Sequence, residues 1–134
     1  MKSISVLVLF LFVWPFSSAK TYHMVANSSV PAASGIISAK KGSPNRNTEL
    51  DIKVTHLAPP SKLTPPANVY VLWIRPIGGD ATNAGAIRVN KNLEGELKTV
   101  TTAKSCDIFI TAEQSATVTS PEGPEVLQTR VDMG

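Results

Sequence analysis

The chain has 134 residues and a formal net charge of +3, from 13 basic and 10 acidic side chains that are interleaved along it. The longest run of like charge is Lys40-Lys41, so the clustered basic surface that releases counterions from nucleic-acid phosphates is missing, and we expect no nucleic-acid partner. The single cysteine, Cys106, excludes a disulfide within the chain, so a domain of this size must be held by its core alone. We interpret Cys106 as a small buried hydrophobe, and the alternative is a reactive or intermolecular thiol.

The first nineteen residues have the layout of a secretory signal. Lys2 precedes an apolar run over 6–16, and the small residues 17–19 follow it. The run is about ten residues long, too short to span a bilayer, which needs roughly 20. We therefore expect residues 1–19 to be a signal peptide and 20–134 to form one periplasmic or secreted domain without a transmembrane segment. The alternative is a retained N-terminal anchor.

After this segment the hydrophobic pattern repeats every second residue, which is typical of half-buried strands, and helical periodicity is nearly absent. The clearest case is the segment 48–57, where Leu50, Ile52 and Val54 alternate with polar side chains. Turn-forming residues separate the segments. The predicted strands are 22–26, 35–39, 48–57, 69–75, 84–90, 96–102, 107–113 and 126–132. This spacing predicts an all-β fold of about seven or eight strands in two packed antiparallel sheets.

Two connections between these strands carry further predictions. The segment 58–66 contains four prolines, which keep it out of a sheet interior, so we expect a crossover between the sheets with Leu57 and Leu63 packed on the core. The segment 91–95 is typical of a short hairpin loop, with Gly95 free to take a positive φ.

The predicted strand 69–75 is apolar on both sides. Val69, Val71 and Trp73 share one face, and Tyr70, Leu72 and Ile74 share the other. A two-sheet sandwich buries only one face of each strand, so another segment must cover the second face, or that face binds a partner. Our candidate partner-binding residues are Tyr70, Leu72, Ile74 and Phe109.

Over about 68–131, the order of short sequence words resembles the C-terminal extracytoplasmic domain of anti-sigma-K-type regulators. These words are Tyr70-Val71-Leu72-Trp73, Asn83-Ala84-Gly85, Ile108-Phe109-Ile110-Thr111-Ala112-Glu113 and Pro121-Glu122-Gly123-Pro124. The resemblance implies a bacterial, immunoglobulin-like β-sandwich outside the membrane, with the Trp in the core, the Thr-Ala-Glu strand beside it and no enzymatic activity. The cytoplasmic helical domain and membrane-spanning helix of those regulators have no counterpart in this sequence.

Few residues in the chain suit catalysis or metal binding. A hydrolytic triad needs a histidine base beside a nucleophile, but the only histidines are His23 and His56, and no G-x-S-x-G elbow is present. We expect no enzyme and no cofactor. A weak alternative is a copper site from His23, Met24 and His56, although neighbours on a strand point to opposite faces.

Two function classes follow from the sequence. The first is an exported, non-catalytic module that binds a protein or cell-envelope component through the apolar face or through an adjacent edge strand. The alternative is an exported protein that binds a small molecule or a metal ion through the 78–83 loop and the two histidines.

Overall fold

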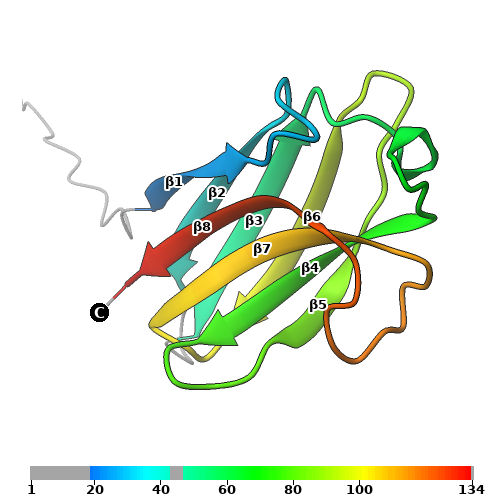
Figure 1. Ribbon diagram of the computed structural model, residues 1–134. Helices are drawn as coiled ribbons and strands as arrows, with labels where there is room; N and C mark the ends of the chain where they lie inside the picture. Colours follow the sequence, from blue (N-terminus) through cyan, green and yellow to red (C-terminus); the bar gives the residue numbers. More distant parts are fainter. Residues whose placement is uncertain (1–18, 43–46, 134) are drawn as a thin grey trace, which may run out of the picture.

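The computed structural model describes residues 19–42 and 47–133, and these residues form eight strands and one short 3-10 helix (Figure 1). The elements are β1 Lys20–Ala26, β2 Ser34–Lys41, β3 Thr48–Thr55, η1 Pro60–Lys62, β4 Val69–Pro76, β5 Thr82–Ile87, β6 Gly95–Thr101, β7 Ser105–Glu113 and β8 Glu125–Asp132. The all-β prediction is confirmed, and each predicted strand overlaps an observed one. The predicted signal peptide, apart from Ala19, lies outside the described residues.

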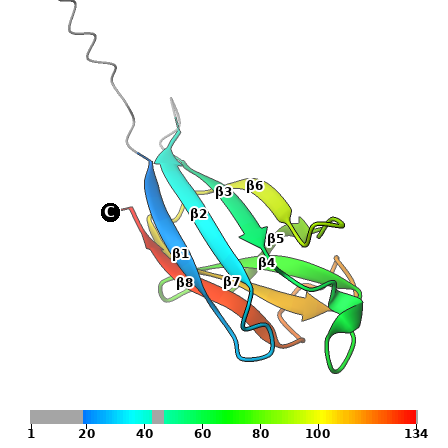
Figure 2. The same cartoon turned by 90° about the horizontal axis from the view of Figure 1, so that it is seen from above.

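The strands form one nearly closed antiparallel sheet in the order β5-β4-β7-β8-β1-β2-β3-β6. Figure 2 shows its two halves facing each other: a first half of β2, β3 and β6, and a second half of β4, β5, β7 and β8. Strand β1 joins the halves, because it pairs with β2 along Lys20–Met24 and with β8 at Val25 and Ala26. The sheet therefore has two edge strands, β5 and β6.

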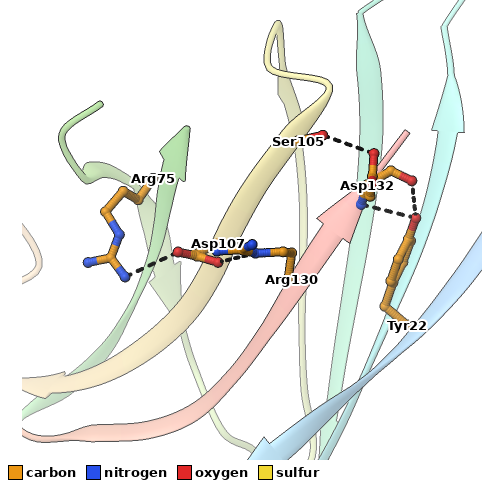
Figure 3. Close-up of polar contacts among 6 residues, drawn as sticks. All are labelled: Tyr22, Arg75, Ser105, Asp107, Arg130 and Asp132. Carbon is orange, nitrogen blue, oxygen red and sulfur yellow. Dashed lines mark hydrogen bonds and ion pairs between the residues drawn. The ribbon is translucent and has the colours of Figure 1, made fainter. Parts of the chain in front are cut away.

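The side chain of Tyr22 connects β1 to β8 beyond the two residues of β1, Val25 and Ala26, that pair with β8 through the backbone. Its hydroxyl donates to the carbonyl oxygen of Asp132 at 2.7 Å and accepts from the Asp132 amide at 3.2 Å (Figure 3). A phenol thus bridges β1 to the end of β8, where the two strands diverge. The junction holds the two halves around a common core.

The core lies between the halves and is built from the alternating apolar residues of each strand. In β3, Leu50, Ile52 and Val54 are at most 2% exposed, as their period-two spacing predicts. Cys106 is also fully buried and free, which confirms its interpretation as a packing residue. Burial raises the pKa of its thiol, and the neighbouring Asp107 charge adds to this effect, so the reactive thiolate is disfavoured.

The proline-rich segment after β3 crosses from the first half to the second, as predicted. It leads from β3 through η1 to β4. Leu57 is fully buried and Leu63 packs against the core from a partly buried position. The crossover places β4 in the middle of the second half, between β5 and β7.

The predicted hairpin at 91–95 is wrong. Strand β5 ends at Ile87 and pairs only with β4, whereas β6 pairs only with β3, so the segment between them joins opposite edges of the sheet. The side chain of Asn90 accepts hydrogen bonds from the amides of Asn92 and Glu94 and folds this segment into a local turn. The positive φ occurs at Leu93, at 63°, and not at Gly95.

Candidate functional site

The structure buries three of the four residues of the predicted binding face in the main core. Tyr70 and Leu72 are fully buried and Ile74 is 5% exposed. Phe109 lies on the opposite face, because it pairs with Trp73 across β4 and β7. These four side chains therefore do not share a surface, and none of them is exposed. Burial also raises the pKa of Tyr70 to about 12, and its hydroxyl donates to the carbonyl oxygen of Ala58 at 2.5 Å.

The outward apolar face of β4 is covered by another segment of the chain. Val69, Val71, Trp73 and Phe109 form a second hydrophobic cluster on the outer side of the second half. Residues 114–124, which we call the cover loop, connect β7 to β8, and their Ala116 and Val118 pack on this cluster. The second buried face predicted for this strand is thus explained by packing within the chain.

A buried carboxylate holds the cover loop in place. Glu113 is 2% exposed, accepts from the amides of Glu122 and Gly123 at 3.1 to 3.2 Å, and accepts from the Thr111 hydroxyl at 2.5 Å. Thr111 in turn accepts from the indole Nε1 of Trp73 at 2.7 Å. Every polar group in this network has a partner, which is the condition for burying a carboxylate. Glu113 is therefore an anchoring residue.

Two residues of the predicted 78–83 ligand loop have structural roles. The side-chain amide of Asn83 donates to the carbonyl oxygens of Ala116 and Val118, each at 2.9 Å, so it ties the cover loop to β5. Gly78, with φ of 80°, shapes the turn between β4 and β5. Of these two residues, Asn83 therefore supports the cover loop.

A charged cluster occupies the outer surface of the second half beyond the cover loop. Asp107 lies between Arg75 and Arg130, with N–O distances of 3.4 and 3.0 Å (Figure 3). The hydrogen bond from Arg130 contributes most to lowering the pKa of Asp107, and the charges of both arginines add to it. Arg75 also lies 4.9 Å from the centre of the Phe109 ring, a cation–π geometry. These contacts link three strands of the second half.

The residues of the weak copper alternative belong to β1 and to the position after β3. His23 is exposed on β1, whereas Met24 beside it is 7% exposed and faces the core, as alternation along a strand requires. His56 follows β3 with a positive φ of 54°. Over 19–42 and 47–133, the structure contains no group of three or more histidine, cysteine, aspartate or glutamate side chains placed to hold a metal ion.

The two edges of the sheet differ in regularity. Strand β5 has six residues, a register shift opposite Leu72 and Trp73, and a glycine, Gly85, with φ of 131°. Strand β6 has seven residues in unbroken register with β3, from Gly95 opposite Val54 to Thr101 opposite Thr48. Among the described strands, β6 pairs with no other neighbour. An extended, regular edge presents unpaired backbone N–H and C=O groups to which another strand can add.

A groove on the outer surface of the first half lies beside this edge. Its volume is about 740 Å³, and β2, β3 and β6 all contribute to its lining. The outward side chains in the lining are Ser38, Lys40, Glu49, Asp51, Lys98 and Val100. We call the free edge of β6 and this groove the β6 site. Unlike the outer surface of the second half, this surface carries no covering loop from the described part of the chain.

The β6 site combines backbone, apolar and charged features. Val100 is 57% exposed at the edge, and Lys40 and Glu49 form an ion pair at 3.6 Å on the neighbouring strands. One carboxylate oxygen of Asp51, Oδ1, is buried and has no hydrogen-bond partner. A buried oxygen without a donor costs free energy.

Sequence reasoning missed the β6 site because its residues look ordinary in the chain. Glu96, Lys98 and Val100 follow the alternation of any half-exposed strand. The signal that β6 is an edge lies in its pairing with β3, about 45 residues away along the chain, and not in its own residues. The sequence allows an edge strand as a binding surface but does not indicate which strand is the edge.

Comparison of the chain with protein-family models found no matching family, and comparisons with curated proteins and with solved structures found no significant match. The resemblance to the extracytoplasmic domain of anti-sigma-K-type regulators therefore stays a prediction. The described residues include no helix long and apolar enough to cross a membrane.

Proposed function

We propose that this chain is an exported, non-catalytic module that binds a protein partner by adding an extended segment of that partner to the free edge of β6. Export to the periplasm or beyond the cell follows from the pattern of residues 1–19. The observation that carries the binding proposal is the edge itself: seven residues of β6 in unbroken register on one side and unpaired on the other.

The groove supports this proposal because it lies where the partner's side chains would point. In an added strand, alternate side chains face the same side as Lys98 and Val100 and so extend over the groove. Such side chains would also contact Val100, which is 57% exposed at the edge. Backbone hydrogen bonds would give affinity, and side-chain contacts over the groove would give selectivity.

Site-specific photo-crosslinking tests the proposal. A photoreactive amino acid replaces Val100 in one variant and Val25 in a control, since both valines are exposed, at 57% and 61%, on outward faces of different strands. In cells that export the protein, we expect covalent adducts from position 100 that map to an extended segment of another polypeptide chain, and none from position 25. Absence of adducts at position 100, or equal adducts at both positions, would overturn the proposal.

A further inference from the structure

The free edge of β6 carries a self-complementary charge pattern. Glu96 and Lys98 flank Leu97, and both charged side chains point outward while Leu97 points inward. When two copies of this triplet run antiparallel with Leu97 opposite Leu97, Glu96 of each copy lies opposite Lys98 of the other. We propose that the partner strand at the β6 site comes from a second copy of this chain, paired antiparallel with Leu97 opposite Leu97. This inference rests on the proposed function, because it names the occupant of the same edge.

The register follows from the charges. With Leu97 opposite Leu97, each Glu96 faces a Lys98 of the other copy, so two opposite-charge pairs form on the outer face. A shift that places Lys98 opposite Lys98, or Glu96 opposite Glu96, sets like charges directly across from each other, which destabilises an antiparallel pair. Of the registers that a two-fold axis allows at this triplet, only the first places both charges opposite partners of the other sign.

The charged side chains are available for such pairing. The carboxylate of Glu96 lies 3.8 Å from the ammonium group of Lys53, but the two side chains are 45% and 64% exposed, so solvent weakens this ion pair. Lys98 lies opposite Asp51 in the register of β3 and β6, yet no ion pair joins Lys98 to any described residue. Pairing with a second copy would give Lys98 a partner that its own chain does not provide.

The inward side of the edge also fits a second copy. Leu97 packs against the main core but stays partly exposed, because the sheet does not close between β6 and β5. A Cβ at Gly85 of β5 would lie 3.4 Å from the methyl groups of Leu97, so β5 of the same chain covers part of this side chain. In the proposed register the Leu97 side chains of the two copies are neighbours, and each covers apolar surface that the other leaves exposed.

Charge reversal at the edge gives a direct test by sedimentation of the purified protein over a range of concentrations. We expect the wild type to dimerise reversibly and Glu96→Lys or Lys98→Glu to dissociate at concentrations where the wild type is paired. An equimolar mixture of the two variants should form dimers again, since one copy then carries two positive edge charges and the other two negative ones. High salt should weaken the wild-type dimer, because the pairs are exposed.

Glu125→Lys is the matched control. Glu125 is also an exposed glutamate on a strand, but it begins β8, in the second half and outside the β6 site. We expect this variant to dimerise like the wild type, with circular dichroism confirming that all variants fold. A wild type that is monomeric at all concentrations, dimers that both edge variants leave intact, or a mixture that does not pair would each overturn the inference.

The outcomes separate this inference from the proposed function. If the wild type is monomeric but position 100 still crosslinks to a different polypeptide, then strand addition at β6 stands and the second copy is excluded as the occupant. If the wild type is monomeric and position 100 forms no adduct, both proposals fail.

Discussion

The two outer surfaces of this sheet show how the same architecture can be closed on one side and open on the other. The outer surface of the second half carries Val71, Trp73 and Phe109, and the cover loop seals it. The outer surface of the first half carries charged side chains, an exposed valine and a groove of about 740 Å³ beside an unpaired edge. The second apolar face of β4 is buried by another segment of the chain. An apolar second face on a strand is therefore not by itself evidence of a binding surface.

Removing the anchor of the cover loop should have the largest effect on stability. Glu113→Ala leaves the amides of Glu122 and Gly123 and the Thr111 hydroxyl without their acceptor, in a buried setting. Because hydrogen bonds to a charged group contribute about 1.5–3 kcal/mol, we expect a loss of about 3 kcal/mol in the free energy of unfolding, measured by urea denaturation. The control is Glu122→Ala, whose side chain is exposed. Equal losses in both variants would contradict the anchoring role.

The same substitution on the two outer surfaces gives a sharper comparison. Val71 is fully buried under the cover loop, whereas Val100 is 57% exposed beside the groove. Val71→Ala should cost about 2 kcal/mol, from lost burial and the cavity it leaves. Val100→Ala should change the free energy of unfolding by less than about 0.5 kcal/mol. Urea denaturation of both variants measures these losses. Similar losses in the free energy of unfolding would mean that Val71 is not more deeply buried than Val100.

Tyr70 tests whether the inner face of β4 is sealed from water. Burial raises the pKa of Tyr70 from 10.0 to about 12, so its contribution is fully present below pH 10 and is lost as the pH rises toward 12. Tyr70→Phe should cost about 1 kcal/mol near neutral pH through the lost hydrogen bond to Ala58. The cost should shrink as the pH rises above 10, in denaturation measured across this range. A cost that stays constant with pH would indicate that the phenol is not buried.

In the charged cluster of the second half, the expected effect is smaller than that of Tyr70→Phe. The hydrogen bond from Arg130 and the nearby arginine charges hold the pKa of Asp107 below its ordinary value, so this residue stabilises the fold above that value. The stabilisation is lost as the pH falls through the lowered pKa. Asp107→Asn should cost less than about 1 kcal/mol near neutral pH, and the difference from wild type should disappear in acid. A difference that grows in acid would reverse the assigned sign.

The strands were predictable from the sequence because each alternates clearly between apolar and polar residues, as Leu50, Ile52 and Val54 do. The role of the two faces of β4 was not predictable. Both Tyr70-Leu72-Ile74 and Val69-Val71-Trp73 are apolar, and only the position of the cover loop decides which set faces outward. The face of the sheet on which Phe109 lies was not predictable either, because it depends on the register between β4 and β7.

The candidate site depended on contacts that lie far apart in the sequence. The hairpin expected at 91–95 would have paired β6 with β5 and removed both edges. Instead, β6 pairs with β3, so the edge exists only because of this long-range pairing. Residues 90–94 do form a turn, because the side chain of Asn90 accepts hydrogen bonds from amides within it. This turn does not require the flanking strands to pair, so its residues do not distinguish a hairpin from the connection that is observed.

Amide hydrogen exchange along the two edge strands tests the central claim most directly. Exchange is measured for the segments Gly95–Thr101 and Thr82–Ile87 in a dilute and a concentrated sample of the purified protein. If β6 pairs with a second copy, its exchange should slow in the concentrated sample, while that of β5 stays unchanged. Protection that appears at β5, or exchange of β6 that is equally fast in both samples, would contradict the account.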